Sequence, residues 1–295
     1  MRTVDNHALT YARALALEHH VPLRVVFSLP PVPKMSIVDT HTPTPTLRQY
    51  AFMVEGLKHV ERELRALHVP FHLLQGGAST KTVPAFVASH HALAVVSDFS
   101  PLRKARKTAT AVAASCQASG IPMVEVDAHN VVPCFHASPK LEYSARTLRG
   151  KYDKVMGQDL VDDCGGAVAP NAPGALEGCA QVDWNEALSA LELDRTVKPV
   201  TWLVPGTAGA MNVLDKFCED RLKLYAEKRN DPNVHASSDL SPYFHFGHLS
   251  SQRAVLHVRS YRHPKHGAQP HSRDAFTEET VVRKELADNF CFYNS

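Results

Sequence analysis

The chain lacks several features that assign a protein to a common class. It has no G-x-G-x-x-G stretch and no G-x-x-x-x-G-K-[ST] loop, which are the fingerprints of dinucleotide-binding and P-loop domains. No apolar run approaches the roughly 20 residues needed to cross a bilayer. The first residues carry no apolar core typical of a signal peptide. We therefore expect a soluble intracellular protein, nuclear or organellar if the source is eukaryotic and otherwise cytoplasmic.

The cysteines do not form a recognisable metal or disulfide pattern. None belongs to a C-x-x-C pair or has zinc-finger spacing to a histidine. Scattered single cysteines are typically buried, reduced thiols, and we predict no metal site. The six are Cys116, Cys134, Cys164, Cys179, Cys218 and Cys291.

Net charge and aromatic content exclude few classes of protein. The net charge of the 295 residues is only +2, so no overall basic field indicates nucleic acid. Tryptophan occurs twice, at Trp184 and Trp202. The 44% hydrophobic and 21% charged content is typical of a globular protein, and the length fits one large or two medium domains.

Helices and strands are predicted to alternate through the first 130 residues. Apolar strands separated by helices favour a parallel sheet that is covered on both faces. The series opens on a helix capped by Asp5 and Asn6, so we expect that the first strand of the sheet is missing. The expected strands cover 22–29, 71–74, 92–97 and 122–126, and the later helices cover 46–67, 81–90 and 102–119.

The second half of the chain changes character. Residues 157–181 are rich in Gly, Ala, Pro and Asp, which predicts a linker or loop. From Asn212 onward the pattern is helical, with one helix beginning at Ser241 and another covering about 277–292. The chain ends on apolar and aromatic residues, which suggests that packing partners are missing.

A serine-rich segment precedes one of these helices. Ser241 is a favourable N-cap and Pro242 a favourable first helical residue. Together with Ser237 and Ser238, it places hydroxyl and backbone N–H groups at the positive end of a helix, a site suited to a pyrophosphate. A plain capped helix after a serine loop is the alternative.

The helix near the end of the sequence carries polar groups among apolar ones. Polar groups on a buried face need partners, so Glu285 either points a hydrogen bond into a pocket or belongs to an exposed ion-paired face. The polar residues are Arg283, Glu285, Asp288 and Asn289, and those expected to bury the helix are Val281, Val282, Leu286 and Phe290.

Two loops follow predicted strands. Residues 96–103 lie at the carboxyl end of a strand, the edge at which open parallel sheets bind ligands, although a turn capped by Asp98 fits equally well. Residues 126–133, followed by 137–149, are interpreted as a polar crossing between domains.

Taken together, these segments resemble the class II photolyases, and the resemblance runs nearly end to end. The matching stretches, in order, are Arg2 with Asp5-Asn6, Glu55-Gly56-Leu57 with Val60-Glu61, Asp98 to Arg103 (DFSPLR), Val126 to Pro133 (VDAHNVVP), Lys140 to Arg149 (KLEYSARTLR), Arg229 to Pro232 (RNDP), Leu240 to Arg253 (LSPYFHFGHLSSQR) and Val282 to Tyr293 (VRKELADNFCFY). Each motif alone is weak, but their number and order make a chance match implausible.

The resemblance implies a fold and a division into domains. Residues 1–130 are expected to form an α/β antenna-type domain with a doubly wound parallel sheet that lacks its first strand. Residues 131–211 are expected to connect it to residues 212–295, the start of an all-α domain that holds FAD and meets DNA. The family extends beyond both ends of this sequence, so we expect a chain truncated at both ends.

The resemblance also assigns roles to residues. Tyr225, Ser237, Ser238, Asp239, Leu240 and Ser241 are expected to hold the phosphates and ribitol of FAD. Glu285 is expected to hydrogen-bond a flipped pyrimidine dimer, and Asn289 to face flavin or lesion. Arg253 and Arg283 are expected to contact DNA. Arg259, Arg262, Lys265 and Arg273 either meet the DNA backbone or are solvated.

The implied function is light-driven repair of cyclobutane pyrimidine dimers in DNA by electron transfer from reduced FAD, a carbon–carbon lyase activity of a monomer. A deazaflavin or folate antenna is possible in the family, and its identity stays open. The family's electron-passing tryptophans lie outside this sequence, so we expect the chain alone to bind FAD poorly and repair little. The alternatives are a cryptochrome-like flavin photoreceptor and a non-catalytic module that binds nucleotide or DNA.

Overall fold

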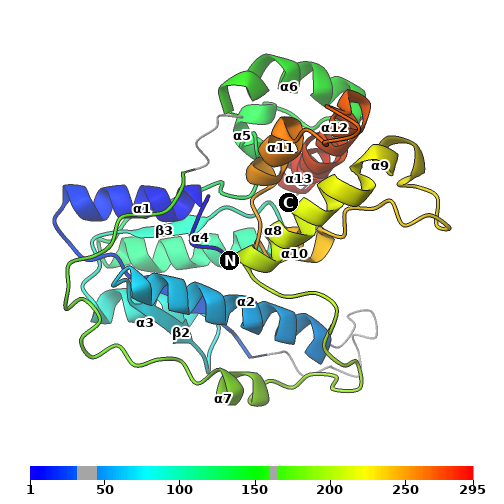
Figure 1. The fold of residues 1–295 in the computed structure, drawn as a ribbon. Coiled ribbons are helices and arrows are strands. Elements are labelled where there is room, and N and C mark those ends of the chain that lie inside the picture. Colours follow the sequence, from blue (N-terminus) through cyan, green and yellow to red (C-terminus); the bar gives the residue numbers. More distant parts are fainter. Residues whose placement is uncertain (32–44, 160–164, 295) are drawn as a thin grey trace, which may run out of the picture.

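The computed structural model describes residues 1–31, 45–159 and 165–294. The chain forms an α/β part, which holds both pairs of strands, and a helical part built from the second half of the sequence (Figure 1). The N-terminus and the C-terminus both lie near the junction of the two parts. No helix of the described residues is long and apolar enough to cross a membrane.

The strands pair in parallel, as predicted, but they form two separate ladders. β1 (Val25–Ser28) pairs with β2 (Phe71–Leu74), and β3 (Val95–Asp98) pairs with β4 (Met123–Val126). Among the described residues no ladder joins β1 to β3. The parallel arrangement is confirmed, and the sheet is split at its centre.

The helices between the strands follow the apolar patterns of the sequence. The Asn6 side chain accepts from Leu9 N at 3.2 Å and caps the first helix. The long second helix buries Val54, Leu57 and Leu64 against the first ladder. The four helices are α1 (His7–Glu18), α2 (Leu47–Ala66), α3 (Ser79–Ser89) and α4 (Arg103–Ala118).

The segment between the α/β part and the helical part packs partly against each of them. α5 (Cys134–Ala137) and α6 (Ala145–Asp159) pack with the helical part, whereas α7 (Trp184–Ser189) packs against α2. α6 ends at Asp159, beyond residue 157 where the linker was predicted to begin. Cys164 lies outside the described residues. The other five cysteines are unpaired, and Cys116, Cys134 and Cys218 are buried as expected.

The helical part encloses a core of aromatic and aliphatic side chains, including Phe217, Leu222, Tyr243 and Phe276. Two π-helical stretches lie among the α-helices of this part. The elements are α8 (Thr207–Lys216), η1 (Phe217–Arg221), α9 (Leu222–Lys228), α10 (Ser241–His245), α11 (Ser251–Ser260), α12 (Pro270–Thr277), η2 (Glu278–Arg283) and α13 (Lys284–Tyr293).

Three local predictions in this part were wrong. The N-cap of α10 is Leu240, so Ser241 is the first helical residue. The last helical stretch begins at Pro270, because α12 passes directly through η2 into α13. Phe290 is 58% exposed, since α13 turns that side away from the core.

The two parts meet through an aromatic contact centred on α2. Phe52 stacks on His248, with ring centroids 5.2 Å apart, and also contacts Tyr243. Gly56, one turn further along α2, allows this approach: a Cβ there would lie 2.1 Å from His248 Nε2. The His248 Nδ1 accepts from Gly206 N at 3.1 Å, and burial lowers the pKa of His248 to about 3.

Candidate functional site

The serine loop, residues 235–241, lies at the surface of the helical part. Ser237 Oγ donates to Asp239 Oδ1 at 3.3 Å, and Leu240 N donates to Ser238 Oγ at 3.5 Å. Both distances are long for bonds of these types, so the two hydroxyls can exchange these partners for a ligand. Asp239 has a φ of 60°, a left-handed conformation that turns the chain into α10. Ser241 is exposed at the start of that helix.

A cation that the sequence analysis missed holds this loop. Arg221 Nη1 donates to Asp239 Oδ2 at 2.6 Å, and His235 Nε2 lies 2.9 Å from the same oxygen. The Arg221 side chain is only 15% exposed. Its position one helical turn before Tyr225 was the available signal, because residues four apart share a helix face.

Tyr225 lies in an aromatic cluster next to Arg221. Its ring contacts Phe217 edge-on, with centroids 5.3 Å apart, and Phe276 at 5.8 Å. The Arg229 guanidinium lies 5.7 Å from the centre of the Tyr225 ring and pairs with Glu279 at 3.2 Å. Burial, and then the Glu279 charge, raises the pKa of Tyr225. Tyr225, Arg221 and the serine loop are therefore brought together as one region.

Glu285 lies elsewhere, beneath the loop that crosses between the parts. Its carboxylate accepts from Val131 N at 2.6 Å, from Val132 N at 3.3 Å and from Tyr152 Oη at 2.6 Å. The residue is 2% exposed. The exposed, ion-paired interpretation is wrong, because Glu285 faces inward. Its partners are backbone N–H groups and Tyr152, so a hydrogen bond into a pocket stays a prediction.

The protonation of Glu285 reflects two opposing effects. Burial raises its pKa, while the Lys284 ammonium and the hydrogen bonds from Tyr152, Val131 and Val132 lower it, and the result is about 7. Burial and the neighbouring carboxylate also raise the pKa of Tyr152. Near neutral pH, Glu285 therefore exists in both its neutral and its charged form.

Asn289, one turn after Glu285, fastens the segment before α6. It is fully buried; its Oδ1 accepts from Glu142 N at 2.8 Å, and its Nδ2 donates to Lys140 O at 3.1 Å. Burial alone would raise the pKa of Glu142, but hydrogen bonds from Lys151 and Ser138 lower it to about 2. Among the described residues, no contact joins Asn289 or Glu285 to the serine loop.

The two arginines predicted to contact DNA differ in their surroundings. Arg253 forms a bidentate pair with Asp5, at 2.9 and 2.7 Å, across the junction. The Arg283 side chain is 56% exposed and pairs with Glu278, which also binds Arg149. Of the further basic residues, Arg273 is 9% exposed and donates to Tyr261 O, so it is not a solvated cation.

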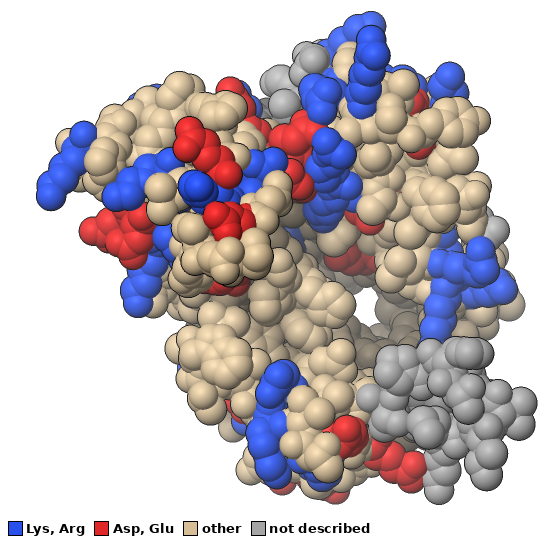
Figure 2. Space-filling model, turned by 90° about the vertical axis from the view of Figure 1, so that its right-hand side faces the viewer, with Lys and Arg blue, Asp and Glu red and all other residues tan. Residues whose placement is uncertain are grey.

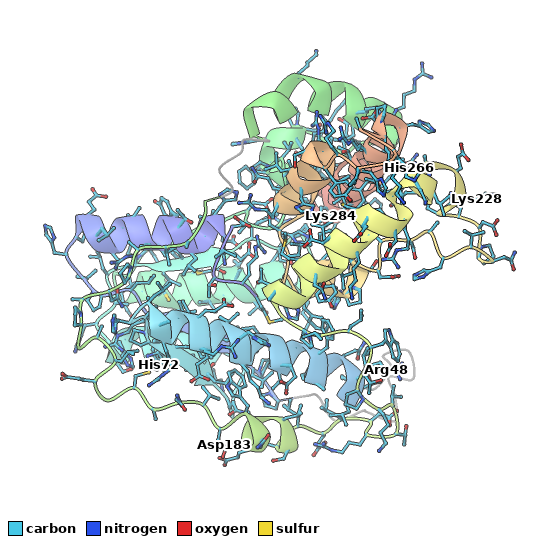
Figure 3. The ribbon with its side chains drawn as sticks, in the orientation of Figure 1. Arg48, His72, Asp183, Lys228, His266 and Lys284 are labelled. Atoms are coloured by element: carbon cyan, nitrogen blue, oxygen red, sulfur yellow. The ribbon has the colours of Figure 1, made fainter. Side chains whose placement is uncertain are left out.

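Figure 2 shows the face on which the helical part presents its outer end. Lysine and arginine side chains form separate groups there, with acidic side chains among them, and no continuous basic surface covers this face. Lys228 and His266 lie toward this outer end, whereas Lys284 lies deeper in the helical part (Figure 3). Lys284, at the start of α13, donates from Nζ to His129 O at 2.8 Å and so holds the loop that follows β4.

The two loops after β3 and β4 are tied to each other. Asp98 Oδ1 accepts from Ala128 N at 3.1 Å. Asp127 accepts from the backbone N–H groups of His129, Asn130 and Cys134. These bonds favour the capped turn and the polar crossing over a ligand-binding edge, because both carboxylates already hold the backbone.

Comparison with known proteins decides the family. A family model described as DNA photolyase matches residues 1–170. The chain belongs to the DNA photolyase family. Over 99% of its length it is 42% identical to a deoxyribodipyrimidine photo-lyase of Potorous tridactylus, and it is 40% identical to one of Oryza sativa subsp. japonica. It spans 52% and 56% of these relatives, so the photolyase chain is about half as long as they are.

Solved structures show the same fold at low sequence identity. A bacterial class III photolyase from Agrobacterium tumefaciens superposes with a TM-score of 0.67 at 19% identity, covering 99% of this chain and 57% of that one. A Synechocystis sp. PCC6803 cryptochrome gives 0.73 at 15% identity, covering 99% and 59%. An α/β region followed by a helical region is therefore confirmed. The proposed domain bounds at residues 130 and 211 stay predictions.

Proposed function

We propose that this chain forms part of a light-driven DNA repair enzyme that splits cyclobutane pyrimidine dimers by electron transfer from reduced FAD. The observation that carries the proposal is the match to curated deoxyribodipyrimidine photo-lyases over nearly the whole chain. Family membership and the site residues support the catalytic assignment. It does not draw on the likeness to solved structures, since folds host many functions.

The serine loop fits the phosphates of FAD. The hydroxyls of Ser237, Ser238 and Ser241 lie near the surface, and their bonds within the loop are weak. Arg221 adds a partly buried positive charge that the carboxylate of Asp239 orients. Hydroxyl, backbone N–H and guanidinium donors are the groups that bind phosphates in proteins. Leu240 anchors the loop because it is fully buried.

Tyr225 is proposed to pack against the same cofactor. Its ring is held on two sides by Phe217 and Phe276, so little side-chain freedom is lost when a ligand binds beside it. FAD, when bound and reduced, supplies the electron that starts ring splitting. The residues of this chain contribute binding, orientation and exclusion of water.

Glu285 and Asn289 are proposed to contact the damaged base. A carboxyl group with a pKa of about 7 is neutral in a large fraction of molecules and can donate a hydrogen bond to a pyrimidine carbonyl. To do so, Glu285 must exchange its bond with Val132 N, the longest of its three. Asn289 must likewise exchange the bond to Lys140 O.

Arg253 and Arg283 are proposed to contact DNA phosphates. Arg283 is the more accessible, since more than half of its side chain is exposed. Flipping a damaged, poorly stacked base costs less free energy than flipping an intact one. We therefore expect that a few phosphate contacts are sufficient to position the duplex. Few contacts also imply a shallow dependence of affinity on salt.

The chain alone is proposed to bind FAD weakly and to repair little, because it spans about half of the relatives it matches. The test is an absorption spectrum of the purified chain before and after addition of FAD, followed by gel filtration. Retention of one flavin per chain would contradict weak binding. A fluorescence titration with FAD then gives the dissociation constant, even if it is high.

The serine loop is tested in the same titration. The double variant Ser237→Ala, Ser238→Ala should weaken FAD binding about tenfold, the effect of losing roughly 1.4 kcal/mol of phosphate contacts. Ser260→Ala, an exposed serine at the end of α11, is the matched control and should bind as the parent does. Equal affinity of all three proteins would remove the serine loop from the site.

The alternatives differ in what they bind. Light-dependent loss of dimers from an irradiated oligonucleotide supports the lyase assignment. Flavin binding without any preference for damaged DNA supports a cryptochrome-like photoreceptor. Binding of DNA or nucleotide without flavin supports a non-catalytic module.

A further inference from the structure

The turn that follows α11, residues 263–267, is closed by hydrogen bonds of its own. His263 N donates to Gly267 O at 2.9 Å, and Gly267 N donates to His263 O at 2.8 Å. His263 Nδ1 accepts from Lys265 N at 3.0 Å and from His266 N at 3.1 Å. The φ of 64° at Gly267 suits a residue without a Cβ. The side chains of this turn are therefore presented from a fixed backbone.

Two arginines hold the turn to the helices around it. Arg262 Nη1 donates to Arg259 O at 3.0 Å and to Tyr261 O at 3.1 Å, so it bonds carbonyl groups at the C-terminus of α11. Arg273 of α12 also donates to Tyr261 O. Of the basic residues singled out in the sequence, Arg262 and Arg273 thus maintain the turn, whereas Lys265 is exposed within it.

Positive groups gather at this turn, which lies toward the outer end of the helical part, where Figure 3 labels His266. The rings of His263 and His266 have centroids 4.5 Å apart. Desolvation lowers the pKa of His266, and the neighbouring His263 lowers it further. The charges of Lys265 and of Lys223, an exposed residue of α9, act in the same direction. These four side chains, the cationic turn, therefore act on one another.

The carboxylates of α8 and η1 act on Tyr261, the residue at the end of α11. After desolvation and the Cys218 thiol, Glu219 and Asp215 contribute most to the raised pKa of Tyr261. The charges that act on His266 are, in contrast, all positive. Like charges held close together repel one another unless an anion offsets them, so the cationic turn is suited to an anionic partner.

We propose that the cationic turn binds phosphates of the DNA backbone away from the damaged base. This role rests on the proposed repair function, to which it adds a contact region besides Arg253 and Arg283. The backbone of a duplex carries a dense row of negative charge, which matches a compact group of exposed cations. Contacts to phosphates carry no sequence information, so this binding should be independent of sequence and of damage.

The members of the cationic turn offer several donors to a phosphate. Lys223 and Lys265 carry ammonium groups, each with three N–H donors. Because His263 Nδ1 already accepts two backbone N–H groups, its ring holds the proton on Nε2, which is left to donate. The closed turn loses little conformational freedom when it binds, since its backbone is already fixed.

His266 couples this binding to pH. Desolvation and the neighbouring cations lower its pKa in the free protein. A bound phosphate offsets those cations and stabilises the protonated ring, so the pKa of His266 rises on binding. Binding is then accompanied by proton uptake, and the affinity for DNA increases as the pH falls.

The test measures binding of the full 295-residue chain to an undamaged fluorescent duplex in the dark, without FAD. Fluorescence anisotropy at several salt concentrations gives the slope of the logarithm of affinity against the logarithm of salt. Lys223→Gln and Lys265→Gln should each weaken binding and reduce this slope by about 0.9, the value for one phosphate contact. Lys81→Gln, at an exposed position of α3, is the matched control and should change neither.

The same duplex tests the dependence on pH. Between pH 7.5 and pH 6 the affinity of the parent chain should rise about threefold, the effect of taking up a fraction of one proton. His266→Gln cannot take up this proton and should lose most of the rise, whereas His19→Gln, exposed at the end of α1, should retain it. A His266→Gln profile parallel to that of the parent would contradict the coupling.

Absence of duplex binding by the parent chain would overturn the proposal, and so would lysine variants that keep the slope of the parent. Poly-glutamate of matched charge that binds the parent as tightly as the duplex would overturn it as well, because the turn would then fit an acidic polypeptide. The assay contains neither FAD nor pyrimidine dimers. Lack of repair activity alone would therefore count against the proposed function and leave this contact standing.

Discussion

Glu285 is a residue at which burial and hydrogen bonding act in opposite directions. Its three donors stabilise the charged form, yet removal from water outweighs them and leaves a pKa of about 7. The unfolded chain has the ordinary glutamate pKa of about 4.3. Below that pKa, Glu285 is protonated in both the folded and the unfolded state, and its contribution to stability is fully present. Between pH 4.5 and 7 the folded state keeps a proton that the unfolded state has lost, so this contribution falls as the pH rises.

We therefore predict that the Glu285 contribution to stability is lost as the pH rises through 7. Linkage gives a loss of about 3 kcal/mol between pH 4.5 and 7.5. Glu285→Gln cannot titrate and should lack this loss. The measurement is urea unfolding of both proteins across the range. His248 has a lowered pKa, so its effect on stability changes with pH in the opposite direction. It is present in both proteins, so this effect cancels when their pH profiles are compared. Parallel pH profiles would show that Glu285 does not titrate there.

Gly56 is the second residue whose surroundings allow a quantitative expectation. Gly56→Ala should lower the free energy of unfolding by about 1–3 kcal/mol, because its Cβ would overlap His248. The control is Gly150→Ala, also in a helix but with open space around it, which should stabilise by about 0.5–1 kcal/mol. Chemical denaturation measures both, and destabilisation of the two variants by the same amount would contradict the contact.

At the scale of elements, the non-helical segment before α7 is held to the α/β part by buried polar groups. Asn171 Oδ1 accepts from Leu23 N at 3.0 Å and from Arg13 Nη1 at 2.8 Å, and its Nδ2 donates to Leu23 O. Glu61 accepts from Val182 N and from Trp184 Nε1. These hydrogen bonds attach a segment without regular structure to the α/β part.

Asn171→Ala should therefore cost about 3 kcal/mol, since it leaves several buried groups unpaired at about 1–3 kcal/mol each. It should also expose the segment around it to limited proteolysis. Asn185→Ala, at an exposed position in α7, is the control and should change neither. Proteolysis rates that match the parent would show that other contacts hold the segment.

At the scale of the whole molecule, the α/β part has hydrophobic clusters of its own, and Phe52 of α2 also enters the core of the helical part. Phe52 of α2 belongs to the same cluster as Tyr243 and Phe217, and the Arg253–Asp5 pair crosses the same junction. Because these contacts join the two parts, we expect them to unfold as one cooperative unit. The fluorescence of Trp184, in the α/β part, and the helical circular dichroism should therefore change at one midpoint.

Phe52→Ala should lower that common midpoint, with a loss of about 3–5 kcal/mol, and should separate the two signals. Tyr143→Ala, whose side chain is 87% exposed, should leave them coincident and unchanged. Two separate transitions in the parent chain would show that the parts unfold independently.

The sequence by itself determined the order and type of the elements and the family. Period-two and period-3.6 patterns are local, so the strands at 25–28 and 71–74 and the helix at 47–66 were predicted within a few residues. The sequence singled out the serine loop and the crossing loop because their residues follow the family's motifs in the same order along the chain.

Only the tertiary structure decided which of those residues meet. Glu285 and Asn289 bond to the segments around Val131 and Lys140 and not to the serine loop. Arg221, which the sequence did not single out, pairs with Asp239. Long-range contacts depend on how helices pack, and no local pattern encodes that. The same reason explains why the strands form two ladders: the apolar pattern predicts each strand, but only the packing of the elements decides that β1 pairs with β2 and β3 with β4.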